Sequence, residues 1–157
     1  MIKIQKSKTA DTRTCSFSQV SKNQLRDSSV QHIRDVAQGM SFFSQMIKEA
    51  AEKHDNDKLS GLDHFHNDFI TGFAQTGWWD NHRATTRHHL LAPDGVPEGV
   101  NLIDILEMIV DCVMAGMGRS GSVYPLDISP DVLMTAFNNT AELLRGQIVV
   151  EEGKSNE

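Results

Sequence analysis

Apolar residues recur at helical spacing along most of the chain. Over residues 30–50 they fall on one face of a 3.6-residue repeat, and Ser28 or Ser29 can cap a helix that starts there. Ser129-Pro130 places a capping serine and a first-turn proline at the start of the last helix. The pattern predicts five helices, which cover approximately residues 28–52, 62–77, 78–90, 101–117 and 130–144.

The predicted fold class is all-α. We expect one helical domain over residues 21–147, preceded over residues 1–20 by an arm or short strands. A polar tail over residues 148–157 can begin with a short strand. The segment from Ala92 to Gly99 contains two prolines and two glycines, which predicts a loop. The 157 residues, 39% hydrophobic and 23% charged, match one ordinary globular domain.

Charge and composition exclude several classes of function. A net charge of -6 argues against a nucleic-acid binder that is held by phosphate contacts. No apolar stretch reaches the ~18 residues of a membrane span, and the first residues lack a signal core, so we expect a cytoplasmic protein. Cys15 and Cys112 are too isolated to predict a disulfide, and Cys112 is expected to be a buried thiol. Apolar surface positions allow a homodimer, although no heptad seam predicts one.

Histidine has an unusual distribution. All seven histidines lie between residues 32 and 89, namely His32, His54, His64, His66, His82, His88 and His89. Solvated histidines would be scattered, whereas a metal or acid–base site gathers them. His64 and His66 project about 200° apart on a helix and cannot reach one site, so they and Asp68 are expected to be mostly solvated.

A second candidate feature is an acidic stripe on the expected helix at 101–117. This helix is apolar nearly all round, which is typical of a central helix. Asp104, Glu107 and Asp111 lie within about 60° of one another on it. Three buried carboxylates repel one another and cost desolvation free energy, so a cation should face them unless the stripe meets solvent. Since few Lys or Arg residues are near, we expect histidines and a metal ion.

His54-Asp55 is the third feature. An imidazole nitrogen and a carboxylate oxygen from neighbouring residues can ligate one cation where the backbone turns, and Asn56-Asp57 favours a turn. By itself such a doublet is more often a surface turn than a ligand pair. His82 and His89 are seven residues apart, which puts both on one face if a single helix holds them.

Together these residues resemble the HD-domain superfamily of metal-dependent phosphohydrolases. That family has a histidine on one helix, a His-Asp doublet on the next and a distant aspartate, here His32, His54-Asp55 and Asp111. The doublet extends to His-Asp-x-x-Lys with Lys58. Glu107-Met108-Ile109-Val110-Asp111 is similar to the Glu-Met-x-x-Asp helix of small HD-like proteins encoded by tailed phages. The resemblance covers residues 28–120 and implies an HD-like helical bundle.

The resemblance also implies a ligand set. A divalent ion (Mn, Zn, Fe, Mg or Co) would be held by His32, His54, Asp55 and Asp111. A second set of histidines would ligate another metal or contact phosphate, and it consists of His82 with His88 or His89.

The same resemblance implies roles for the other polar residues. Lys58 would neutralise developing negative charge, Glu107 would orient a ligand or act as general base, and Arg87 would clamp a phosphate. Asp104 would contact the ligating residues rather than the metal. Trp78 could stack a nucleobase, although packing in the core or at its rim is the more common role for such a residue.

The function expected from the resemblance is metal-dependent hydrolysis of a small phosphorylated substrate such as a nucleotide. Two alternatives remain open. An HD-like module without activity could sequester a nucleotide or inhibit a host factor, and a purely structural protein could carry these histidines incidentally.

Overall fold

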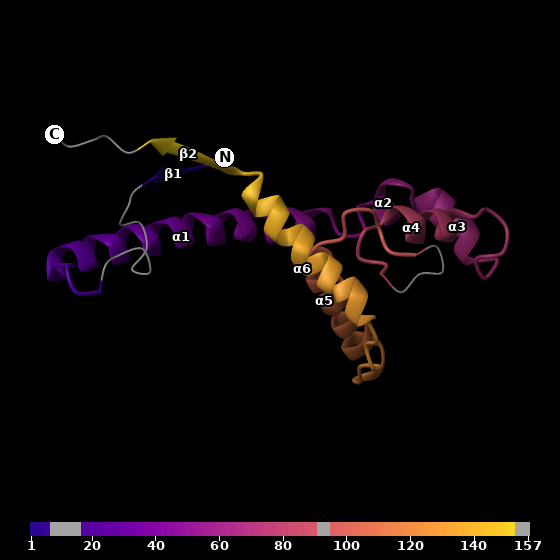
Figure 1. The fold of residues 1–157 in the computed structure, drawn as a ribbon. Coiled ribbons are helices and arrows are strands. Elements are labelled where there is room, and N and C mark those ends of the chain that lie inside the picture. Colours follow the sequence, from indigo (N-terminus) through magenta and orange to yellow (C-terminus); the bar gives the residue numbers. More distant parts are fainter. Residues whose placement is uncertain (7–16, 91–94, 153–157) are drawn as a thin grey trace. The chain divides into compact units, whose positions relative to one another are not determined.

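A computed structural model of the chain describes residues 1–6, 17–90 and 95–152. These parts contain two strands and six helices (Figure 1): β1 (Ile2–Lys6), α1 (Lys22–Lys53), α2 (Asn56–Ser60), α3 (Leu62–Phe69), α4 (Trp78–Thr85), α5 (Leu102–Ser120), α6 (Pro130–Arg145) and β2 (Ile148–Glu152). The prediction of a mainly helical chain is confirmed. Our expectations for Cys15, for residues 7–16 of the N-terminal arm, for the first part of the 92–99 loop and for the end of the tail fall outside the described residues.

The helix boundaries differ from prediction where local capping decides them. α1 begins at Lys22 because Ser21 and Gln24 form a reciprocal cap: the Ser21 hydroxyl accepts the Gln24 N–H, and the Gln24 side chain accepts the Ser21 N–H. The helix predicted over 62–77 ends at Phe69, since Gly72 and Phe73 both adopt positive φ. The helix predicted over 78–90 ends at Thr85, because Thr86 adopts an extended backbone conformation.

The described residues form two compact units, residues 1–46 with 142–157 and residues 47–141. The first unit contains a two-stranded parallel sheet, in which Ile2 pairs with Ile148 and Lys6 with Glu152. The strand predicted at 148–150 is therefore confirmed as part of β2. The Gln31 side chain of α1 donates to the Gln5 carbonyl at 2.8 Å and ties β1 to the helix. The boundaries that we expected at residues 20 and 147 stay predictions.

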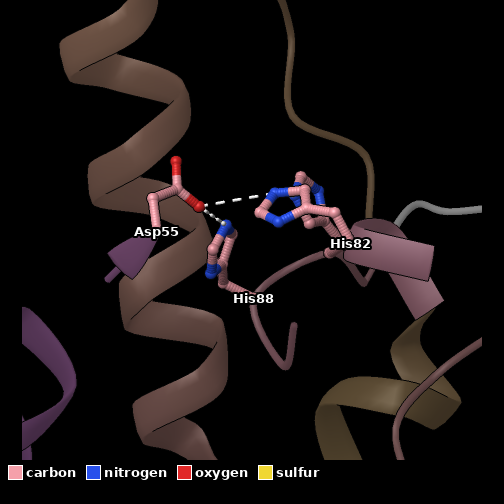
Figure 2. Close-up of side chains that lie close together, drawn as sticks. Asp55, His82 and His88 are labelled. Atoms are coloured by element: carbon pink, nitrogen blue, oxygen red, sulfur yellow. Dashed lines mark hydrogen bonds and ion pairs between the residues drawn. The ribbon is translucent and has the colours of Figure 1, made fainter. Parts of the chain in front are cut away.

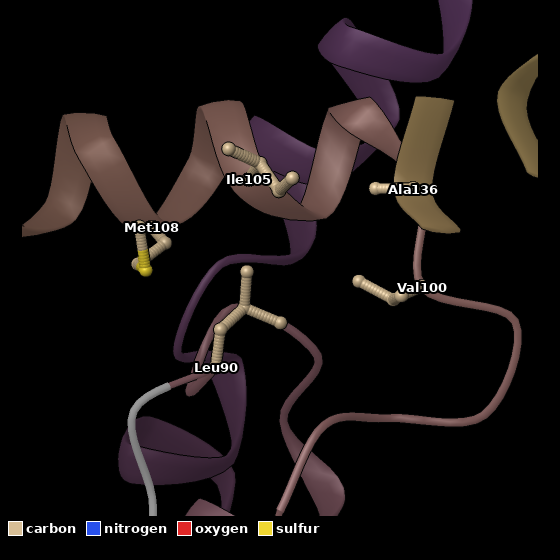
Figure 3. Close-up of a cluster of buried hydrophobic side chains, with 5 residues drawn as sticks. All are labelled: Leu90, Val100, Ile105, Met108 and Ala136. Atoms are coloured by element: carbon tan, nitrogen blue, oxygen red, sulfur yellow. The ribbon is translucent and has the colours of Figure 1, made fainter. Parts of the chain in front are cut away.

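The second unit has a small apolar core (Figure 3). Ile105 and Met108 of α5 form one buried cluster with Leu90, and Val100 and Ala136 complete the set. Cys112, expected to be buried, is partly buried against this core as a free thiol. Burial of these side chains fixes the inner face of α5, and with it the direction of the acidic stripe.

Hydrogen bonds from α6 fix the start of α5. Thr140 accepts the backbone N–H of Leu102 at 2.9 Å, and the Asn139 amide donates to the Val100 carbonyl at 2.8 Å. Asn101 caps α5 as predicted, in a capping box with Asp104. The expected end near residue 117 is wrong by one turn, because α5 continues to Ser120.

None of the helices in the described part of the chain is long and apolar enough to cross a membrane.

Candidate metal centre

The site begins where α1 ends. Asp55 adopts the left-handed conformation with φ of 53°, which breaks the helix between His54 and Asn56. Asp55 is the N-cap residue of α2, yet its carboxylate makes no capping bond. That carboxylate is instead bonded to Lys58 and faces the imidazoles of His82 and His88. The turn thus brings the side chains of the His-Asp doublet to one site.

Three imidazoles and one carboxylate converge at this turn (Figure 2). Asp55 Oδ1 lies 3.4 Å from His82 Nε2 and 3.6 Å from His88 Nε2. His89 Nε2 lies 3.0 Å from His82 Nε2. One ligand atom from each of these four residues lies within 4.8 Å of the others. We call Asp55, His82, His88 and His89 the four-residue cluster.

Carboxylates lie behind the histidines of the cluster. His82 Nδ1 is 2.7 Å from Asp57 Oδ2, and His88 Nδ1 is 3.1 Å from Glu107 Oε1. An ionised carboxylate can only accept a hydrogen bond, so both rings carry their hydrogen on Nδ1 and present the Nε2 lone pair to the cluster. The same carboxylate–histidine arrangement orients ligands in metal sites.

The spacing of the donor atoms fits a metal ion. A tetrahedral zinc ion with ligands at about 2.1 Å holds them about 3.4 Å apart. Three pairs of donor atoms in the cluster are 3.0, 3.4 and 3.6 Å apart, and all four atoms lie within 4.8 Å of one another. Asp55 Oδ1 and His88 Nε2 are buried and have no hydrogen-bond partner. Two buried polar atoms left unpaired are costly, and a cation between them would satisfy both.

The electrostatics favour the protonation states that a metal requires. Burial alone would raise the pKa of the Asp55 carboxyl, but the hydrogen bond and charge of Lys58 and two nearby histidines lower it. Burial lowers the pKa of His88, although the Glu107 carboxylate opposes it. Burial and the two neighbouring histidines lower the pKa of His89 to about 4. At neutral pH the cluster therefore offers the Asp55 carboxylate and the neutral imidazoles of His88 and His89.

His54 and Asp111 lie beside the cluster. His54 Nδ1 is 2.9 Å from Glu107 Oε1, and its Nε2 is 3.6 Å from both Asp55 Oδ2 and Asp111 Oδ1. Glu107 thus joins His54 and His88 through one oxygen, and these three residues form a second group that could hold an ion. The ring centroids of His54 and His88 are 4.5 Å apart. Asp111 and Glu107 of the acidic stripe accordingly face histidines, as the sequence led us to expect.

Asp104 has a different partner. Arg87 donates to both of its oxygens at 2.8 and 2.7 Å and also to the carbonyls of Glu98 and Gly99. The expectation that few basic residues are near the stripe is therefore wrong for its first member. These four hydrogen bonds hold the Arg87 guanidinium against the protein. Asp104 also takes part in the capping box at the start of α5.

Aromatic rings surround His82. Trp78 and Trp79 stack on it with centroids at 5.1 and 5.2 Å, and Trp78 also packs on Phe65. The Lys58 ammonium lies 5.6 Å from the Trp79 ring. In this structure, Trp78 packs on the His82 ring, which is the alternative we gave to nucleobase stacking. His82 itself is fully buried.

The remaining histidines lie outside both groups of donors. His32 is exposed on α1 within the first unit, whereas all members of the two groups belong to the second. His64 and His66 are exposed on α3, as expected. Asp68 is not solvated: it is fully buried and accepts the backbone N–H groups of Thr76 and Trp79, both at 2.9 Å. It thereby fixes the start of α4, which carries His82.

The sequence did not predict a role for Asp57 at the site, because Asn56-Asp57 indicated only a turn. Its role depends on a partner 25 residues away, and no local spacing predicts that pair.

Comparison with known proteins finds no family model, curated protein or solved structure that matches the chain.

Proposed function

We propose that the chain is a metal-dependent phosphohydrolase with an HD-like fold and that the four-residue cluster holds its metal ion. The observation that carries the proposal is the unpartnered Asp55 Oδ1, toward which the Nε2 atoms of His82 and His88 point. His32, which the resemblance implied as a ligand, is not a member of either donor group found in the described residues, and the proposal does not use it.

The protein residues have distinct roles in this proposal. A divalent ion at the cluster would polarise a phosphoryl oxygen and lower the pKa of a bound water. His54 donates its Nδ1 hydrogen to Glu107, which leaves its Nε2 lone pair, 3.6 Å from Asp55 Oδ2, as a proton acceptor beside the cluster. Lys58 is bonded to Asp55 and supplies positive charge next to the Asp55 carboxylate.

The coordination number decides between an enzyme and a binding module. Four protein ligands fill a tetrahedral zinc site, and such closed sites are structural. An ion that takes more ligands, such as manganese or iron, would keep positions for water and substrate. Zinc in the cluster therefore favours the inactive nucleotide-binding module, and manganese or iron favours the hydrolase.

The test is phosphate release from a panel of phosphomonoesters and nucleotides, with the protein loaded in turn with Mn²⁺, Fe²⁺ and Zn²⁺. We expect release with Mn²⁺ or Fe²⁺, and loss of that activity in Asp55→Ala. The matched control is Asp63→Ala, which removes an exposed aspartate from the first turn of α3. Equal activity of wild type and Asp55→Ala, or none with any metal, rejects hydrolysis. Tight metal binding without release supports the binding module.

A further inference from the structure

A pocket of about 340 Å³ lies next to the proposed metal centre, within the unit formed by residues 47–141. Its walls are mainly apolar side chains from the last turns of α1 and from α5, among them Ile47, Ala50, Leu106, Val110 and Met114. The polar residues that line it are His54, Glu107 and Asp111.

Those three polar residues connect the pocket to the metal centre. His54 and Glu107 are members of the second donor group, and the Glu107 oxygen already accepts from two imidazoles. The His54 Nε2 and Asp111 Oδ1 atoms are 3.6 Å apart, too far for a hydrogen bond. A molecule in the pocket would therefore contact polar groups on the side formed by His54 and Asp111 and apolar side chains elsewhere.

The charges around the pocket disfavour a polyphosphate. No Lys or Arg is among its lining residues, whereas two carboxylates are. Three basic residues close in sequence to the cluster have carboxylate partners: Lys58 is bonded to Asp55, Arg83 to Asp80 and Arg87 to Asp104. A chain of phosphates in the pocket would face like charge and desolvation with no cation to offset them.

We propose that this pocket binds the uncharged, apolar part of the substrate, so that the substrate is a phosphomonoester of an apolar alcohol rather than a nucleoside triphosphate. This inference rests on the proposed function for its reactive group, but the pocket's ligand class can be tested alone. An apolar cavity of about 150 Å³ accommodates benzene. The pocket is roughly twice that size, which matches a bicyclic aryl group or a branched alkyl chain.

The test uses 1-naphthol as an uncharged probe and 1-naphthyl phosphate and ATP as substrates. Naphthol binding is measured with metal-free protein by the broadening of the naphthol NMR signals in the bound state, so that this readout does not depend on the metal site. Ala50→Phe fills the pocket, and Ser44→Phe puts the same ring on an exposed position of α1 outside it. Val110→Lys changes a half-exposed lining residue into a cation with little risk to folding.

We expect one naphthol per chain, at least tenfold weaker binding in Ala50→Phe, and unchanged binding in Ser44→Phe. The kcat/KM for naphthyl phosphate should exceed that for ATP at least tenfold, and Val110→Lys should reduce that ratio. Unchanged naphthol binding in folded Ala50→Phe and Val110→Lys, or a preference for ATP in wild type, overturns the inference. Pocket-dependent naphthol binding with no hydrolysis of either ester supports the ligand class and rejects the phosphohydrolase.

Discussion

Removal of the Asp57 carboxylate should weaken metal binding although Asp57 is not a ligand. Its Oδ2 accepts the Nδ1 proton of His82 at 2.7 Å, and the His82 side chain is fully buried. Asp57→Ala therefore leaves the ring without the acceptor that directs its Nε2 lone pair toward the cluster.

The expected loss of metal affinity depends on which hydrogen-bond acceptor remains for His82 Nδ1. Loss of such a partner typically costs about 10–100-fold in metal affinity, or about 1.4–2.7 kcal/mol. The Thr86 hydroxyl lies 3.2 Å from the same His82 nitrogen and can accept its proton, though without charge. We therefore expect Asp57→Ala to lie near the tenfold end and Asp57→Ala/Thr86→Val near the hundredfold end.

The assay is competition between the protein and a chromophoric chelator for Zn²⁺ or Mn²⁺. Asp63→Ala is the matched control, because Asp63, like Asp57, is an acidic residue in the first turn of a short helix. It corrects for the loss of a favourable helix-dipole charge of about 0.3–1 kcal/mol. Equal metal affinity in Asp57→Ala and Asp63→Ala would refute the reasoning that His82 is a ligand oriented by Asp57.

Three further predictions concern stability. Burial lowers the pKa of His89 from 6.5 to about 4, so between these pH values the unfolded chain binds more protons than the folded chain. The free energy of unfolding of metal-free protein, measured in urea, should therefore fall as the pH drops from 6.5 toward 4. The fall should be less steep in His89→Gln. Gly116→Ala should lower the free energy of unfolding by about 1–3 kcal/mol, because its new Cβ would lie 2.6 Å from a backbone oxygen, whereas Gly118→Ala, with open space, should be neutral or stabilising by up to ~1 kcal/mol. Arg87→Met should destabilise by about 1–3 kcal/mol in thermal unfolding because it leaves the buried Asp104 carboxylate without its guanidinium partner, yet metal affinity should not change.

Local signals in the sequence predicted several elements well. Asn101 and Ser129-Pro130 mark the starts of α5 and α6, since a cap is decided by residues within one turn. The start of α1 was missed because Ser21 and Gln24 form their cap ahead of the apolar repeat. Helix boundaries that depend on capping residues within one turn can therefore be predicted from the sequence.

The candidate site could be predicted only in part. The clustering of histidines indicated His82, His88 and His89, but our argument for His82 and His89 was a shared helix face. α4 ends at Thr85, and the two rings meet because the chain turns after it. The pairs of Asp57 with His82 and of Arg87 with Asp104 join residues 25 and 17 positions apart, and only tertiary packing selects them.

The central claim is that Asp55, His82, His88 and His89 together hold one divalent ion. The most direct measurement is metal content after equilibrium dialysis against limiting Zn²⁺ or Mn²⁺, for wild type, His88→Ala and the exposed-residue control His66→Ala. The account predicts one tightly bound ion per chain in wild type and His66→Ala, and at least a hundredfold loss of affinity in His88→Ala. No retained ion in wild type, or equal retention in folded His88→Ala, would contradict it.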